Sequence, residues 1–211
     1  MKKFVGDLSD SDALLIEQYA SSSGVRSVLE FGAGGSTQII AQCLDRAGAE
    51  LVSVETDPRW IATTRERLGL LGVSNRCRFV NYAGWRRTKV VRSSQPFSLV
   101  FVDGLGAERL NFARAAWPLL SVGGVMLFHD TRRPQDVANV LALVSERNEE
   151  VASVIMNEAP AHVSHDNSSS SNTTVVLKKK RERYVNWKSR SGRPKWRYGA
   201  EAVPPEFWRS S

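Results

Sequence analysis

The stretch with the most evident chemistry reads VLEFGAGGST, an apolar run that stops at an acid and is followed by glycines. The acid is Glu30, the glycines are Gly32, Gly34 and Gly35, and Ser36 supplies a hydroxyl. Backbone without side chains lets a ligand lie directly against the chain. If a helix begins here, its first amides can bind an anion, and Glu30 can hold an ammonium through water or backbone. The stretch therefore predicts a site for a small molecule that carries both charges.

Four further polar side chains follow apolar runs. Glu55 ends LVSVE, Asp103 ends FSLVFVD, and the pair His129 and Asp130 ends VGGVMLFHD. If these runs are parallel strands, their ends meet at the edge that holds the glycine loop. A carboxylate such as Glu55 can accept from two adjacent hydroxyls, as in a ribose. We expect Asp103, His129 and Asp130 to form the catalytic group, with His129 as a general base near neutral pH and Asp130 orienting its ring.

Strands and helices that alternate along the chain would bring these residues together. Apolar runs predict strands at 25–31, 50–56, 76–82, 97–104, 122–130, 150–158 and 173–179, and helices at 9–20, 36–48, 57–72, 107–118 and 134–147. This order predicts the α/β class, with a doubly wound, mostly parallel seven-stranded sheet and helices on both faces. The last two strands have no helix between them, so we expect an antiparallel hairpin at the sheet edge.

Local signals mark several helix ends and core positions. Ser9 or Ser11 can cap the first helix, and Asp57 before Pro58 can cap the third. The pattern places Trp60 between its helix and the sheet and favours core or lid packing for Trp85. Cys43 and Cys77 are predicted to be buried free thiols. The segment 83–95 stays unassigned, and His162 with His165 is interpreted as part of a polar loop.

Two known glycine-rich motifs, each typical of a different ligand, can be compared with the stretch VLEFGAGGST. A dinucleotide fingerprint needs a third glycine where this chain has Thr37, so the dinucleotide pattern fails. In contrast, LEFGAGGST resembles the acid-x-Gly-x-Gly motif of class I S-adenosylmethionine-dependent methyltransferases. LVSVETDPRW, FSLVFVDG and LLSVGGVMLFHD are similar to their second-, fourth- and fifth-strand motifs, in the same order. The resemblance, from about Ser9 to Lys179, implies that S-adenosylmethionine is the cofactor.

The resemblance also assigns expected roles. It implies that Glu30, Gly32, Gly34, Gly35, Ser36, Glu55 and Asp103 bind the donor, with Glu55 on the ribose. The activity implied is methyl transfer to a small-molecule acceptor, through a hydroxyl oxygen of a sugar or phenolic compound.

A metal is a separate question. A catechol and caffeoyl subgroup of this family binds a divalent metal through an aspartate after the fourth strand and an Asp-Asn pair after the fifth. Asp103 and Asp130 match two of these ligands and are the only metal candidates, while Thr131 stands in the asparagine position. Magnesium would be the metal if one binds, because hard cations prefer oxygen ligands.

The positive charge is concentrated at the C-terminus. The net charge is +7; from Lys178 onward the chain holds 11 of its 29 Lys and Arg but only 3 of its 22 Asp and Glu, so the tail carries +8 and the rest −1. We therefore expect a methyltransferase domain at 1–179 and a basic, aromatic extension at 180–211. Such a tail suits a lid, an arm in a homo-oligomer, or stacking on nucleic acid.

Three function classes thus remain open. The first is the small-molecule methyltransferase, the second a nucleic-acid-binding protein or RNA methyltransferase that works through its tail, and the third a nicotinamide oxidoreductase. No run is long and apolar enough for a membrane span, and MKKFVGDLSD is a poor signal peptide. The sequence therefore predicts a cytoplasmic protein without membrane contact.

Overall fold

The computed structural model describes residues 8–47, 49–87, 91, 96–156, 172–179, 185–188 and 194–197. The chain divides into two compact units, 1–179 and 180–211. In the second unit, β8 (Val185–Lys188) pairs antiparallel with β9 (Pro194–Arg197). The expectations for His162 and His165 lie outside the described residues, and in the tail the structure describes only the backbone of these two strands. Among the helices described, none has the length and apolar character needed to span a membrane.

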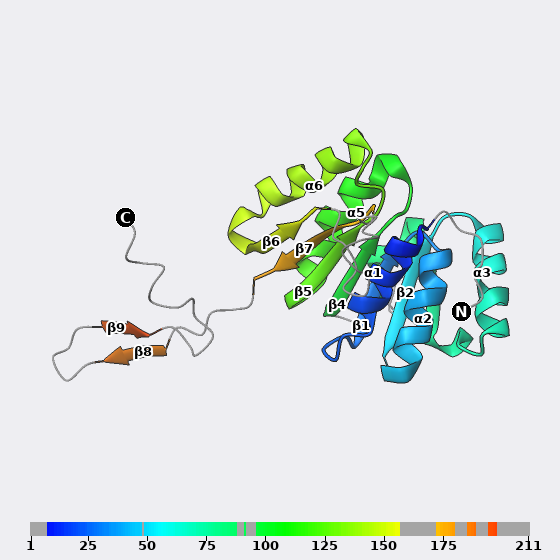
Figure 1. Cartoon of the computed structure of the whole chain (residues 1–211), viewed down its shortest axis with the longest axis horizontal. Coiled ribbons are helices and arrows are strands. Elements are labelled where there is room, and N and C mark those ends of the chain that lie inside the picture. The colour runs from blue at the N-terminus through cyan, green and yellow to red at the C-terminus, as the bar shows by residue number, and fades with distance from the viewer. Residues whose placement is uncertain are drawn as a thin grey trace, which may run out of the picture. The chain divides into compact units, whose positions relative to one another are not determined.

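The first unit is a seven-stranded sheet with helices on both faces (Figure 1), as predicted. Its strands are β1 (Ser27–Phe31), β2 (Glu50–Glu55), β3 (Cys77–Asn81), β4 (Phe97–Val102), β5 (Leu120–Phe128), β6 (Val151–Ile155) and β7 (Thr174–Lys178), and its α-helices are α1 (Asp10–Ala20), α2 (Gly35–Ala47), α3 (Pro58–Leu70), α5 (Arg109–Ala116) and α6 (Pro134–Glu146). The strand order is β3-β2-β1-β4-β5-β7-β6.

The predicted hairpin has a topology that the pattern did not specify. β7 pairs antiparallel with both β5 and β6, so it lies between them and β6 forms the edge of the sheet. The remaining pairs, β3–β2–β1–β4–β5, are parallel. The chain therefore reverses its direction of winding between β1 and β4, which is the place where ligands bind in open α/β sheets.

Alternating strand residues separate two apolar layers. One cluster packs Val28, Leu51 and Phe101 against helices α1 and α2, and the other packs Phe31, Val100 and Met126 against α5 and α6. The period of two residues in a strand sends neighbours to opposite faces, so both faces can be buried. The sheet is therefore held rigidly from both sides, and the ends of its strands are fixed in position.

The helix-capping residues predicted from the sequence lie at the beginnings of helices in the structure. The side chain of Ser9 accepts from the amide of Asp12 at the start of α1, and Asp57 caps α3 directly before Pro58. Cys43 and Cys77 are buried and are not joined in a disulfide. The unassigned segment begins with a 3-10 helix, Tyr82–Arg87. The ring of Trp85 is buried against Phe31 at 4.9 Å between centroids, which agrees with core packing.

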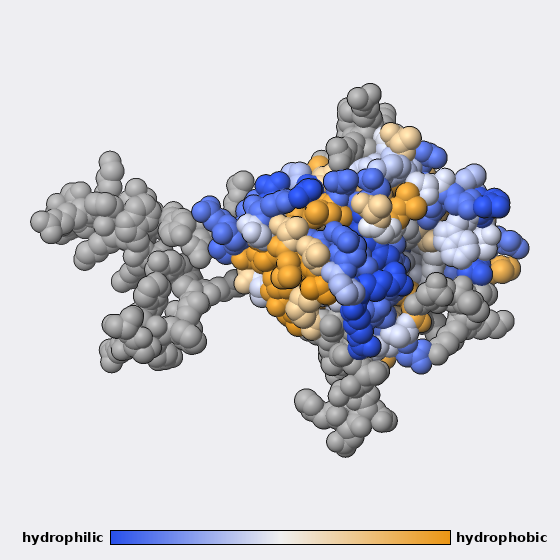
Figure 2. Space-filling view, turned by 90° about the horizontal axis from the view of Figure 1, so that it is seen from above, coloured by the Kyte–Doolittle hydropathy of each residue, from blue (hydrophilic) through white to orange (hydrophobic). Residues whose placement is uncertain are grey.

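The surface carries both hydrophobic and hydrophilic residues (Figure 2). Figure 2 shows hydrophobic residues gathered in one area of the face that it views, beside a band of hydrophilic ones. Large exposed side chains include Leu70, Leu105 and Leu141. They lie in three different elements or loops, and singly exposed apolar side chains are ordinary for a globular protein.

Candidate active site

The glycine loop after β1 approaches the end of β4 very closely. Gly32 has a φ of +95°, and a Cβ placed there would lie 2.9 Å from the backbone nitrogen of Gly104. Its amide donates to the carbonyl of Val54 at 2.9 Å, and the amide of Asp103 donates to the carbonyl of Phe31 at 2.9 Å. Only glycine adopts this conformation at little cost in so narrow a space. The close packing of the ends of β1 and β4 therefore requires glycine at this position, in addition to the room that glycine leaves for a ligand.

Glu30 lies beneath this loop and is fully buried. Ser36 Oγ donates to its Oε1 at 2.6 Å, and Thr37 Oγ1 and Ser53 Oγ donate to its Oε2, each at 2.7 Å. Burial raises the pKa of Glu30 to about 7, although the three hydroxyls oppose that shift. Because the carboxyl group is enclosed, Glu30 can act on a ligand only through the loop that it supports.

The raised pKa of Glu30 makes a prediction about stability. Since the folded pKa lies above the usual 4.5, the folded state binds the proton more tightly, and stability is lost as pH rises from about 4.5 through 7. Glu30→Gln, which is neutral throughout, should lose less stability between pH 5 and pH 8, by at most about 3 kcal/mol. Thermal unfolding of both proteins across this range measures the difference. Parallel pH profiles would show that Glu30 is already ionised when folded at pH 5.

Glu55, at the end of β2, faces the loop from the other side. Its Oε2 accepts from the amide of Ala33 at 3.0 Å, and its Oε1 accepts from the amide of Asp57 at 3.0 Å. These bonds hold the carboxylate at the rim of the cavity. The amide and the hydroxyl of Thr56 also donate to Oε1, at 2.5 Å and 3.1 Å, so Glu55 is oriented before any ligand binds, and Oε2 is the oxygen that keeps a position for a ligand hydroxyl.

Trp60 corrects one expectation. Its side chain does not lie in the core between α3 and the sheet: it is 40 % exposed, and its indole nitrogen donates to the carbonyl of Ala33. The ring stands 3.5 Å from the position of a Cβ on Gly34. The physical reason is that Trp60 occupies the first turn of α3, which begins beside the glycine loop. Its side chain therefore covers the loop and lines the cavity.

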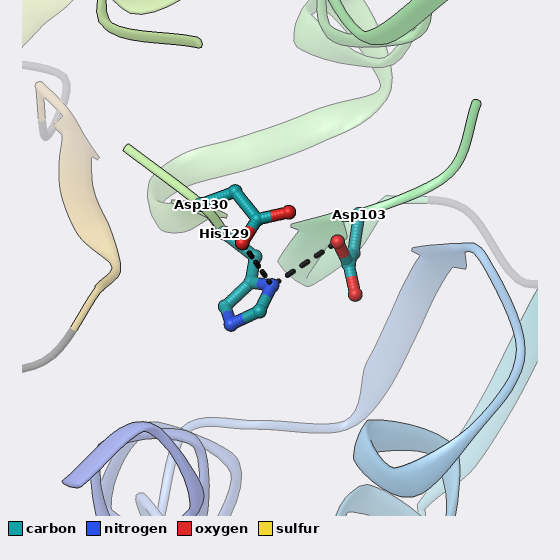
Figure 3. A group of neighbouring side chains, drawn as sticks. All are labelled: Asp103, His129 and Asp130. Atoms are coloured by element: carbon teal, nitrogen blue, oxygen red, sulfur yellow. Dashed lines mark hydrogen bonds and ion pairs between the residues drawn. The ribbon is translucent and has the colours of Figure 1, made fainter. Parts of the chain in front are cut away.

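Asp103, His129 and Asp130 do come together at the ends of β4 and β5 (Figure 3). His129 Nδ1 lies 3.1 Å from Asp103 Oδ1 and 3.7 Å from Asp130 Oδ1. Asp130 has a φ of 62°, a left-handed conformation that is uncommon for residues other than glycine. This backbone turns the chain sharply after His129, so both side chains stay at the end of the strand.

The surroundings of His129 raise the pKa of its imidazole. The side chain is 4 % exposed, and burial alone would lower its pKa, but hydrogen bonds and the charges of Asp103, Asp12 and Asp130 outweigh burial and raise it to about 10. At neutral pH the imidazole is then protonated. In this form it donates to carboxylates, so the direction of the pKa shift disfavours the general-base role, and the catalytic part played by His129 stays a prediction.

Sequence reasoning missed several members of this cluster. Asp12, on α1, is 1 % exposed; its Oδ2 lies 3.6 Å from His129 Nε2, and its Oδ1 accepts from Thr173 Oγ1 at 2.8 Å. Burial opposes ionisation, yet contacts with His129, Ser9 and Thr173 lower its pKa to about 2. An acid in the first turn of a helix is an ordinary helix-start signal. No pattern in the sequence therefore pointed to its contact with His129.

Arg109 and Asn172 were also missed. The guanidinium of Arg109 forms ion pairs with Asp103 at 2.9 Å and Asp130 at 3.0 Å, and Asn172 Nδ2 donates to Asp130 Oδ1 at 3.0 Å. Thr131, in contrast, contacts β7: its hydroxyl accepts from Thr174 Oγ1 at 2.8 Å. The chain therefore places a cation and an amide, rather than the side chain of Thr131, beside the two aspartates.

One cavity of about 540 Å³ joins these parts. The glycine loop, Glu55 and Trp60 line it together with Asp103, His129 and Asp130. Its volume falls in the range of small-molecule sites, and its place at the carboxyl ends of parallel strands is the usual one. The arrangement can hold a ligand with hydroxyl groups near Glu55 and expose the other end of that ligand to the charged cluster.

Comparisons with known proteins agree with this geometry. A family model described as a methyltransferase domain matches residues 29–131, which include the loop, Glu55 and the charged pair at the end of β5. No curated protein matches the chain at the level of sequence.

Solved structures with the same fold come from several organisms. The O-methyltransferase TomG from Streptomyces achromogenes, in complex with S-adenosylmethionine, is 19 % identical over 83 % of each chain, with a TM-score of 0.62. An O-methyltransferase from Bacillus cereus, in complex with S-adenosylhomocysteine, is 15 % identical over 82 % of this chain and 83 % of that one, with a TM-score of 0.64. The S-adenosylhomocysteine-bound methyltransferase PaMTH1 from Podospora anserina is 17 % identical over 79 % and 76 %, with a TM-score of 0.58. At these identities the likeness establishes the fold.

Proposed function

We propose that the chain transfers a methyl group from S-adenosylmethionine to a hydroxyl oxygen of a small acceptor, because residues 29–131 match a family model described as a methyltransferase domain and solved O-methyltransferases share the fold. The resemblance stated from the four strand-end motifs is thereby confirmed. The observation that carries the proposal is a single cavity containing both the glycine loop with Glu55 and the Asp103–His129–Asp130 cluster.

The donor half of the cavity suits the two ends of the donor. Glu55 would accept from the ribose hydroxyls, and the amides of Gly34 to Ser36 would meet the carboxylate of the methionine part. Trp60 would cover the loop side. Three methyltransferases of the same fold were solved with S-adenosylmethionine or S-adenosylhomocysteine bound, which supports this choice of ligand.

The acceptor half suits an oxygen nucleophile. The acceptor oxygen would form a bond to the methyl carbon as the carbon–sulfur bond breaks and the sulfur leaves as a neutral thioether. The oxygen must also lose its proton, and Asp103, the most exposed carboxylate of the cluster at 28 %, is the proposed acceptor of it. The positive charges of His129 and Arg109 would favour the developing negative charge on the oxygen.

Calorimetry and a transfer assay test the proposal. The purified protein should bind S-adenosylmethionine and S-adenosylhomocysteine, and methyl-labelled donor should pass its label to members of a panel of phenols and sugars. Asp103→Asn should slow the transfer while leaving donor binding measurable. Binding of NAD in place of either sulfur compound, or label transferred only to RNA, would overturn the proposal in favour of an alternative.

Neither alternative gains support from the site. For a nicotinamide cofactor the third glycine of the fingerprint is replaced by Thr37, whose hydroxyl accepts from the amide of Gly34 at 2.7 Å and donates to Glu30. The side chain thus fills the space that the dinucleotide pattern leaves open. The nucleic-acid alternative depends on side chains of the tail, of which the structure describes only the backbone of β8 and β9.

A further inference from the structure

We propose that the guanidinium of Arg109 is the resident cation of the charged cluster, and that the cluster does not bind a divalent metal ion. The question arises because Asp103, His129 and Asp130 offer ligand atoms within 4.8 Å of one another. These are the residues whose positions suggested a metal. Their oxygens, however, already have a cation, and the donor set does not fit a second one.

Every N–H group of Arg109 has an acceptor. Nε donates to the carbonyl of Gly104 at 3.1 Å, and Nη1 donates to the carbonyl of His129 at 3.2 Å and pairs with Asp136 at 3.1 Å. Nη2 donates to Asp103 Oδ1 at 2.9 Å and to Asp130 Oδ2 at 3.0 Å. A guanidinium has five N–H donors, so this one is fully satisfied. The pocket around it is built for its planar shape.

Asp103 and Asp130, whose carboxylates would bind a metal, already accept hydrogen bonds from other side chains. Asp130 Oδ2 accepts from Arg109 and also pairs with Arg133 at 2.7 Å, while its Oδ1 accepts from Asn172 Nδ2. Three of its roughly four lone-pair positions are therefore taken. Asp103 Oδ1 accepts from Arg109 and lies 3.1 Å from His129 Nδ1. Magnesium demands near-octahedral oxygen ligands at short distances, and Asp103 Oδ1 and Asp130 Oδ2, which share Nη2 of Arg109, cannot both supply them without releasing that guanidinium.

Releasing Arg109 would be costly. Its side chain is 7 % exposed, and three carboxylates surround it. Removing one partner of a buried ion pair leaves an uncompensated charge, which is strongly unfavourable. A divalent ion beside a retained guanidinium would face like charge from Arg109 and Arg133. Arg109 therefore opposes metal binding in both cases, whether its guanidinium is released or retained.

The consequence rests on the proposed function: methyl transfer by this chain should not depend on added metal. Arg109 lines the cavity and joins the ends of β4 and β5 through Asp103 and Asp130. It would hold the two carboxylates in place, as a metal ion would, and keep positive charge beside the reacting oxygen. A fixed side chain supplies this charge at any concentration of free magnesium.

Metal binding can be measured without knowing the acceptor. The full chain, freed of metal with EDTA, is titrated with Mn²⁺ while the electron paramagnetic resonance signal of the free ion is followed. The wild-type protein should leave that signal unchanged, and excess Mg²⁺ should not raise its Tm. Stoichiometric Mn²⁺ binding that disappears in Asp130→Asn would overturn the proposal.

Variants of Arg109 test the exchange of one cation for another. Arg109→Ser should gain a Mn²⁺ site, and the double variant with Asp130→Asn should lose it again. The matched control is Arg114→Ser on the same helix, whose partner Glu146 is exposed at the surface; it should gain nothing. A folded Arg109→Ser protein that binds no Mn²⁺ would overturn the claim that the guanidinium occupies the place of a metal.

If Arg109→Ser does not fold, Arg109→Lys answers the question. Lysine keeps one charge but cannot bridge several carboxylates with a planar fork. It should lower the Tm by about 5 °C or more, whereas Arg114→Lys should change it little. An unchanged Tm in Arg109→Lys would contradict a built guanidinium site. Calorimetry with S-adenosylmethionine on the same proteins separates this outcome from a failure of the proposed function.

Discussion

Replacing Glu55 with alanine is expected to weaken binding of S-adenosylmethionine by about 10- to 100-fold, because a hydrogen bond from the ribose to a charged acceptor is lost at about 1.5–3 kcal/mol. The carboxylate also accepts from the amide of Ala33, so the loop loses a support as well. Calorimetry with S-adenosylmethionine and S-adenosylhomocysteine measures both affinities. Glu55→Gln keeps the size of the side chain but not its charge. Its affinity for the donor should lie between those of the alanine variant and the wild-type protein.

A control for Glu55 exists on the same strand. Glu50 begins β2 and pairs with Arg78 at 3.2 Å, with both side chains about half exposed. Glu50→Ala removes a carboxylate from the opposite end of the strand, so donor binding should stay unchanged. Equal affinities of Glu55→Ala and wild-type protein for the donor would remove Glu55 from the proposed ribose contact.

Gly32→Ala is expected to destabilise the fold by about 2 kcal/mol or more and to abolish donor binding, because strain and collision act together. The residue has a φ of +95°, and a Cβ would lie 2.9 Å from Gly104 N and 3.0 Å from the carbonyl carbon of Asp103. Both atoms are backbone, so the ends of β1 and β4 would have to separate. Thermal or urea unfolding measures the loss of stability.

Two other glycines separate the causes. Gly72 has a φ of +74° but no atom within 4 Å of a Cβ, so Gly72→Ala should show the cost of backbone strain alone, about 1–2 kcal/mol. Gly69 lies in α3 with open space and no positive φ, so Gly69→Ala should be neutral or slightly stabilising. A Gly32→Ala protein as stable as Gly69→Ala would mean that the loop is not packed as described.

Much of the fold could be predicted from the sequence, because the signals for helices and strands are local. Asp57 before Pro58 caps α3, and Ile40 and Leu44 face inward from α2, since these features reflect backbone preference and periodicity. The glycines, Glu55 and the acids after β4 and β5 were likewise predictable, because parallel strands present their carboxyl ends at one edge.

What each side chain meets at that edge was decided only by tertiary structure. Asp12 contacts His129 from the first helix, and Arg109 reaches Asp103 and Asp130 from α5. The same limit applies to Trp60, whose apolar size suggested the core although the start of α3 lies beside the loop.

The amino-acid sequence by itself determined the order of strands and helices, the bare loop after the first strand, and the acids at the strand ends. The folded chain alone decided that β7 lies between β5 and β6, that Glu30 is sealed under the loop, and that a guanidinium joins the two aspartates. The reason is physical: secondary structure follows from neighbouring residues, whereas the charge state and partners of a buried group depend on residues that only folding brings within a few ångströms.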